Sequence, residues 1–239
     1  MISQEQIQIL AKKYQTEEVN VWREYFQHLF LSYFYQQPEA GKIYFKGGTA
    51  LRVIYGSPRF SEDLDFSSSL KNIKVIEQAV IVTLGEIERA GIDTDIQEAK
   101  QTTGGYLATT AFKTNNHKTS LQLEISFREG KKDGEVATVA SDFLPPYTLV
   151  HLAQAQLVGE KIKALLTRGK ARDFYDLYFI LRANLLPAEK RNIIPAALKA
   201  LQQSDVRFDR ELKQFLPKSH WPLIRDFSSA LEREIKRFL

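Results

Sequence analysis

The chain has 239 residues and a mass of 27.5 kDa, enough for one large domain or two small ones with a sizeable core. No stretch approaches the ~18 apolar residues of a membrane span, and the polar N-terminus lacks an export signal, so we expect a soluble, cytoplasmic protein with no membrane partner. The absence of cysteine excludes disulfides, thiol nucleophiles and thiolate metal sites, and four scattered histidines argue against a zinc centre.

The formal net charge of +4 is unevenly distributed. Residues 160–172 carry five basic side chains against one acidic, and residues 190–239 carry eleven against six. A basic C-terminal half attracts phosphate-rich partners such as nucleic acid or nucleotides, although a solvated helical surface explains the same charges.

The first third of the chain predicts helices around a short glycine turn. Residues 1–36 predict two helices, because aromatic side chains recur at helical spacing in a stripe that suits core packing. Residues 43–45 predict a strand, residues 49–55 a helix capped by Thr49, and residues 63–66 a second strand. A third helix is expected to begin at Asn72 and to end at Gly91.

The pattern then changes to alternating strands and finally to helices. Strands are expected at residues 92–100, 105–114, 119–128 and 136–143, and the pattern is helical from Pro145-Pro146 to the end. The expected fold is therefore α+β, with a mixed-sheet domain and its N-terminal helices in residues 1–145. A helical domain is expected in residues 146–239.

A glycine turn in residues 45–51 (Phe-Lys-Gly-Gly-Thr-Ala-Leu) joins a predicted strand to a predicted helix start. Backbone N–H groups at such a turn, backed by the helix dipole, suit a phosphate group. Glycine lets the backbone approach a ligand closely because it has no Cβ. Most glycine pairs are merely turns, so the fragment alone is weak evidence.

Carboxylates on two predicted strands form the second candidate feature. Asp63 and Asp65 share one face of a strand because residues two apart point the same way. Two such carboxylates repel by ~4 kcal/mol at 4 Å and an effective dielectric of about 20, which favours a divalent cation between them. If the strand of residues 119–128 lies beside them, Glu124 adds a third carboxylate for one or two Mg²⁺ ions. A solvent-facing acidic strand is the alternative.

The predicted helices of the C-terminal half carry cations and carboxylates on adjoining faces. Lys161 and Arg168 fall on the same side of one helix, and Asp173 and Asp176 share a side of the next. An interhelical salt-bridge network explains this pattern without any ligand.

Together these segments resemble the AbiEii/AbiGii-type toxin nucleotidyltransferases. The glycine turn followed by residues 59–66 (Arg-Phe-Ser-Glu-Asp-Leu-Asp-Phe) is similar to the first motif of that family. Glu160-Lys161 with Arg168 resembles its Lys…Arg helix motif, and residues 172–177 (Arg-Asp-Phe-Tyr-Asp-Leu) resemble its final motif. The segments occur in the family's order across residues 45–178.

The resemblance implies a minimal nucleotidyltransferase fold of the polymerase-β type with an appended helical bundle. It implies a toxin paired with an antitoxin, and relatives that add nucleotides to the 3′ end of tRNA. By position, Asp63 and Asp65 are expected to bind Mg²⁺, with Glu124 as the third carboxylate. The expected nucleotide-binding residues are Lys46, Gly47, Gly48, Thr49, Arg168 and Asp173, and Lys161 and Asp176 are expected to be essential.

The expected reaction is the transfer of a nucleotide from a nucleoside triphosphate to an RNA hydroxyl, with release of pyrophosphate. Three alternatives stay open. The acceptor could be a small hydroxyl compound, the chain could be a silent module that binds nucleotide, RNA or antitoxin, or the charged pairs could be salt bridges of a scaffold.

Overall fold

The computed structural model describes residues 1–114, 117–127 and 130–239. Residues Met1–Gly56 and Phe60–Ala153 form one compact unit. The second unit consists of Gln154–Leu239 together with the short segment Ser57–Arg59. The chain therefore passes between the units three times.

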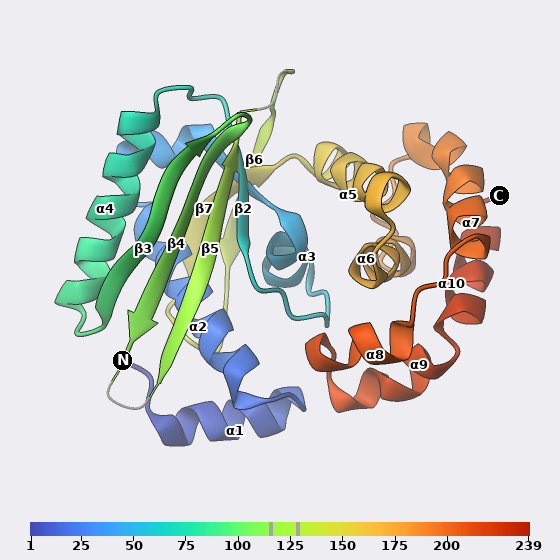
Figure 1. The fold of residues 1–239 in the computed structure, drawn as a ribbon, viewed down its shortest axis with the longest axis horizontal. Helices are drawn as coiled ribbons and strands as arrows, with labels where there is room; N and C mark the ends of the chain where they lie inside the picture. Colours follow the sequence, from blue (N-terminus) through green and yellow to red (C-terminus); the bar gives the residue numbers. More distant parts are fainter. Residues whose placement is uncertain (115–116, 128–129) are drawn as a thin grey trace. The chain divides into compact units, whose positions relative to one another are not determined.

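The first unit combines helices with a mixed sheet (Figure 1). Its helical elements are α1 (Gln4–Tyr14), α2 (Glu18–Phe34), η1 (Pro38–Lys42), α3 (Gly47–Tyr55) and α4 (Ile73–Arg89). Its strands are β1 (Ile43–Lys46), β2 (Leu64–Ser68), β3 (Asp93–Thr102), β4 (Gly105–Lys113), β5 (Lys118–Ser126), β6 (Gly134–Val139) and β7 (Tyr147–Leu152).

The described strands form one sheet in the order β3-β4-β5-β2-β1-β7-β6. The pairs β2–β5 and β1–β7 are parallel, and the other neighbouring strands are antiparallel. The sheet is therefore mixed, as the sequence predicts, and β2 lies directly between β1 and β5.

One face of this sheet is apolar and covered by α2 and α4 (Figure 1). Phe26 of α2 stacks on Phe112 of β4 with ring centroids 5.2 Å apart, and Phe34 of α2 packs against Phe66 of β2 at 5.5 Å. Along β5, Leu121, Leu123 and Ile125 are buried, whereas Ser120, Gln122 and Glu124 are exposed. The polar side chains of β5 consequently point to the opposite face of the sheet.

The second unit is helical. Its elements are α5 (Gln154–Arg168), α6 (Ala171–Arg182), η2 (Ala188–Ile193), α7 (Ile194–Gln202), α8 (Phe208–Glu211), η3 (Lys213–Phe215), η4 (Lys218–His220), α9 (Trp221–Arg225) and α10 (Phe227–Lys236). Its core is aromatic: Phe208 packs against Phe174 and Phe227 at centroid distances of 5.5 and 4.8 Å. None of the helices in the described residues is long and apolar enough to span a membrane.

Several local predictions are confirmed. Helices α1 and α2 occupy the first 36 residues, and the Asn72 side chain caps α4 by accepting a hydrogen bond of 3.1 Å from the Lys74 backbone. Strands β3 to β6 occupy the four predicted segments within a few residues. Residue 128, the predicted end of one of these strands, lies outside the described residues.

Two local predictions are wrong. Residues 147–152 continue the sheet as β7 instead of beginning the helical half, and their Tyr, Thr and Val side chains are typical of a strand. Thr49 does not cap α3, because the helix begins at Gly47 with Lys46 as its N-cap. The Thr49 hydroxyl instead donates a hydrogen bond of 2.5 Å to the Asp63 carbonyl oxygen.

Candidate functional site

The glycine turn brings the start of α3 against Asp65. Gly47 has a φ of +84°, in the left-handed region that favours glycine. A Cβ on Gly47 would lie 2.0 Å from Oδ2 of Asp65, so the carboxylate occupies the space that a side chain would need. The position therefore requires glycine for both its backbone angle and its neighbour.

Three predicted site residues lie in one row across adjacent strands. Lys46 of β1 is the register partner of Asp65 of β2, and Asp65 is the register partner of Glu124 of β5. Register partners point to the same face of a sheet. The structure thus places Glu124 beside Asp65, on the face opposite the apolar core.

The side-chain carboxylates of Asp65 and Glu124 form no ion pair or hydrogen bond with any other described residue. Asp65 is half-buried and Glu124 is exposed. Two ionised carboxylates on neighbouring strands that form no ion pair repel each other, which favours a bound cation. This arrangement differs from an ordinary acidic surface because Asp65 also touches a helix N-terminus.

The described part of the chain contains no metal site made wholly of protein ligands. No group of three His, Cys, Asp or Glu side chains among the described residues is arranged to hold a metal ion. Mg²⁺, however, is usually held by one or two carboxylates together with water and substrate phosphates. The pair of unpartnered carboxylates fits Mg²⁺ shared with a phosphate ligand and does not fit a metal held by the protein alone.

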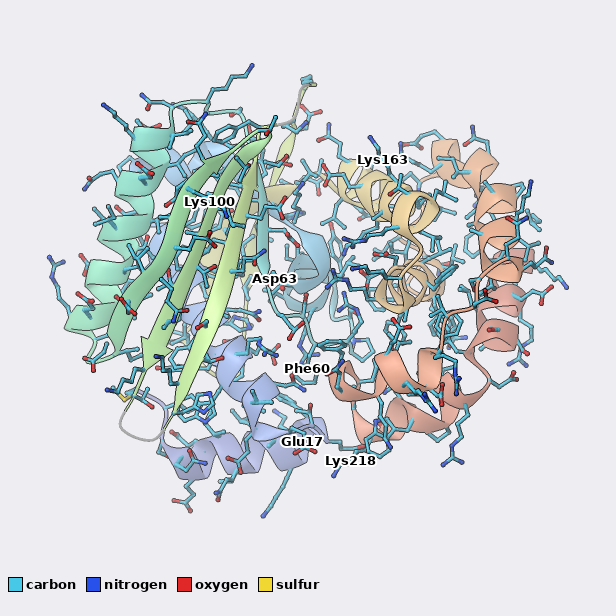
Figure 2. All side chains as sticks on the ribbon, in the orientation of Figure 1. Glu17, Phe60, Asp63, Lys100, Lys163 and Lys218 are labelled. Carbon is cyan, nitrogen blue, oxygen red and sulfur yellow. The ribbon has the colours of Figure 1, made fainter. Side chains whose placement is uncertain are left out.

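Asp63 lies directly before β2 (Figure 2), and its backbone is fixed by Thr49. Thr49 is 1% exposed, and its hydroxyl is already used by the Asp63 carbonyl. Gly48 is also buried. Thr49 and Gly48 consequently shape the turn in this structure, whereas Gly47 lies at its surface.

In the second unit, Asp176 is a buried carboxylate that two cations share. Arg59 donates to it from Nε at 2.8 Å and from a terminal nitrogen at 3.1 Å, and Lys161 Nζ donates at 2.7 Å. Burial alone would raise the pKa of Asp176, but the charges of Arg59 and Lys161 outweigh it and hold the pKa below its ordinary value. Asp176 is thus ionised and positions these two cations.

Arg168 and Asp173 close the connection between α5 and α6. The Arg168 guanidinium donates two hydrogen bonds of 2.9 and 2.8 Å to the two oxygens of Asp173. The backbone N–H of Lys170, the N-cap of α6, also donates to Asp173 at 3.1 Å. Arg168 and Asp173, two of the six residues predicted to bind nucleotide, therefore join two helices, as in the salt-bridge network that the sequence left open as an alternative.

Two arginines of this unit were not among the predicted site residues. Arg59 stands four residues before Asp63 and binds a carboxylate 117 residues away in the chain. Arg172 has a buried Nε with no hydrogen-bond partner and no ion pair among the described residues. Their positions at the start of residues 59–66 and 172–177 could have marked both arginines as candidate site residues. Local spacing, however, does not show which partner either one would have.

Comparisons with known proteins agree on the fold. JHP933 from Helicobacter pylori superposes with a TM-score of 0.64 at 24% identity, covering 93% of each chain. The nucleotidyltransferase toxin MenT4 from Mycobacterium tuberculosis H37Rv superposes with a TM-score of 0.70 at 17% identity, covering 97% of this chain and 89% of its own. No curated protein matches the sequence.

A family model gives the more specific result. The model of the nucleotidyl transferase AbiEii toxin, of type IV toxin–antitoxin systems, matches residues 29–238. This range includes the glycine turn, the carboxylates of β2 and β5, and the ion pairs of α5 and α6. The chain therefore belongs to the AbiEii toxin nucleotidyltransferase family.

Proposed function

We propose that this chain is a Mg²⁺-dependent enzyme that transfers a nucleotide from a nucleoside triphosphate to an RNA hydroxyl, with the 3′ end of tRNA as the expected acceptor. The observation that carries the proposal is the unpartnered pair Asp65 and Glu124 beside the N-terminus of α3. Carboxylates next to a phosphate-binding turn are suited to phosphoryl transfer and contribute little to stability. As a toxin, the chain has a cognate antitoxin as its second expected partner.

The proposed reaction exchanges one bond at the α-phosphorus. The acceptor hydroxyl oxygen bonds to the α-phosphorus, the bond to the bridging oxygen breaks, and pyrophosphate leaves with the electron pair. Asp63 and Asp65, with Glu124 beside them, would hold Mg²⁺, and the ion would neutralise triphosphate charge. In this proposal the Glu124 carboxylate also accepts the hydroxyl proton, and the backbone N–H of Gly47 donates to a phosphate oxygen.

Positive charge for the triphosphate comes from Lys161 in this proposal. Its ammonium has three donors, of which the structure uses one on Asp176. Asp176 is buried and both its oxygens accept hydrogen bonds, so it orients Lys161 and does not itself touch the substrate. Catalysis here rests on positioning and electrostatics without a covalent enzyme intermediate.

A transfer assay tests the proposal. Purified full-length protein is mixed with Mg²⁺, total tRNA and each α-labelled nucleoside triphosphate in turn. Asp65→Asn removes the charge of the proposed metal ligand with little change in size. Asp95→Asn, on exposed β3, is the matched control for the same chemical change.

We expect label on RNA with the wild type and with Asp95→Asn, but none with Asp65→Asn. Normal transfer by Asp65→Asn would contradict the assignment of this carboxylate. Label on a small hydroxyl compound instead of RNA would show that RNA is not the acceptor. No incorporation at all by the folded wild type would favour a silent binding module.

A further inference from the structure

We propose that Gln27, on α2, is a positioning residue of the candidate site, because it holds the backbone that leads into the carboxylates of β2. This inference rests on the proposed function and adds to it a residue that touches neither the metal nor the substrate. Gln27 precedes residue 29, where the match to the family model begins. It therefore lies outside both the sequence motifs and the range of that match.

The chain just before β2 has no regular secondary structure, so its backbone groups need partners elsewhere. Side chains supply these partners for three carbonyl groups in succession. Gln27 donates from Nε2 to the carbonyl oxygens of Ser61 at 3.0 Å and of Glu62 at 3.1 Å. The Thr49 hydroxyl donates to the carbonyl oxygen of Asp63. The path of the chain into β2 is thus set by one side chain of α2 and one of α3.

Gln27 is suited to this task because it is buried on the face of α2 that supports the same segment. The residue is 1% exposed, so water hardly competes for its amide, whose two protons match the two carbonyl groups. Glu24, one turn earlier on α2, holds the guanidinium of Arg52. That guanidinium lies over the Phe60 ring at 3.6 Å from its centroid. Helix α2 therefore supports the chain from Phe60 to Glu62.

This support acts on the candidate site because the carboxylates follow the held carbonyl groups directly. Asp63 comes immediately after Glu62, and Asp65 comes two residues later, with its carboxylate against Gly47. Without Gln27 the chain before β2 can shift while β2 stays between β1 and β5 in the sheet. Groups that orient metal ligands from behind typically account for about ten- to a hundredfold in metal affinity or activity. We expect the lower value, because Gln27 acts through the backbone.

Nucleotide binding with and without metal tests the inference apart from the transfer reaction. Isothermal titration measures the affinity of full-length protein for a non-transferable triphosphate analogue, with a methylene group between the α- and β-phosphorus, in Mg²⁺ and in EDTA. The ratio of the two affinities is the gain that the metal provides. Gln27→Met keeps the length of the side chain without its donors, and Gln27→Asn keeps the amide on a shorter side chain. Asp65→Asn is the reference for a lost metal ligand.

Two controls separate this role from a general effect on folding. Gln36→Met makes the same change at an exposed glutamine, which donates to the Ser32 carbonyl oxygen at 3.0 Å. Thr83→Val removes a buried hydroxyl that donates at 2.7 Å to the Ala79 carbonyl oxygen on α4, the helix that packs on the apolar face of the sheet. Urea unfolding curves confirm that each variant is folded and give its stability.

We expect Gln27→Met to reduce the gain from Mg²⁺ about tenfold, and Gln27→Asn to reduce it less, while the affinities in EDTA stay the same. Asp65→Asn should abolish the gain, and both controls should keep it. In the transfer assay, the Mg²⁺ concentration for half-maximal rate should rise about tenfold in Gln27→Met. An unchanged gain in the folded Gln27 variants, or an equal reduction in Thr83→Val, would overturn the inference and leave the proposed function intact. A folded wild type that gains nothing from Mg²⁺ would overturn both.

Discussion

Replacing Gly47 by alanine tests the closest contact of the candidate site. The added Cβ would lie 2.0 Å from Oδ2 and 2.8 Å from Cβ of Asp65, distances that real side chains do not tolerate. A rotation of the Asp65 carboxylate away from the turn relieves the contact with Oδ2 but not the contact with Cβ, so the start of α3 and the β2 backbone at Asp65 must also move apart. The substitution should therefore move the proposed metal ligand without removing it.

The expected loss of stability in Gly47→Ala has two parts, backbone strain and a steric clash. A substitution at a second glycine measures the strain alone. Gly56, the C-cap of α3, has a φ of +76°, but no atom lies within 4 Å of the Cβ that an alanine would add there, so Gly56→Ala measures backbone strain alone, about 1–2 kcal/mol. Gly47→Ala adds the collision with Asp65, which overpacking data place at about 1–3 kcal/mol. We expect a total loss of about 2–5 kcal/mol in the free energy of unfolding for Gly47→Ala.

Urea unfolding followed by circular dichroism gives these free energies, and the transfer assay gives the activity. Displacing a catalytic group by about 1 Å can cost about a hundredfold in rate, so Gly47→Ala should lose transfer beyond its loss of stability. Gly56→Ala should keep its activity. Equal stability of the two variants, together with full activity of Gly47→Ala, would refute the reasoning about Asp65.

Three further predictions concern charged and titratable groups. Burial, with a smaller contribution from Arg52, lowers the pKa of His28 to about 3, so the stability it contributes above pH 6.5 is lost as the pH falls toward 3. Between pH 7.5 and pH 5 the wild type should lose about 2 kcal/mol more than His28→Gln in urea titrations, and equal losses would contradict the shift. Asp176→Asn should lower the free energy of unfolding by about 3–5 kcal/mol, because it leaves two buried cations unpaired. A double-mutant cycle of Asp176→Asn with Arg59→Met should show strong coupling, and additive losses would contradict the shared ion pair. Arg168→Gln should cost less than Arg59→Met in the same assay, because the Arg168 side chain is 44% exposed; the reverse order would contradict the pairing described.

The parts of the fold that depend on local spacing could be predicted from the sequence. The alternation along β5 is local, so the face of Glu124 was predictable, as was the Asn72 cap. Which strand lies beside β5 could only be assumed from the sequence, because strand pairing is a contact between segments far apart in the chain. In the structure that strand is β2, with Asp65 and Glu124 in parallel register.

The remaining differences have the same physical origin. Thr49 has the side chain of an N-cap, but a carbonyl of the next strand accepts its hydrogen bond, and no local rule contains that partner. Residues 147–152 follow two prolines and precede a long helical pattern, which hides a six-residue strand although its side chains favour one. The roles of the cations depend on which carboxylates they reach, which only the packing of α5 on α6 decides.

The segment Ser57–Arg59 belongs to the second unit, although it is synthesised before most of the first unit. Arg59 leaves the ribosome 117 residues before the carboxylate that neutralises it. At about 5–20 residues per second, its burial must wait for about 6–23 s of synthesis. Any part of the first unit that folds before Asp176 has been synthesised must therefore do so while Arg59 lacks this carboxylate.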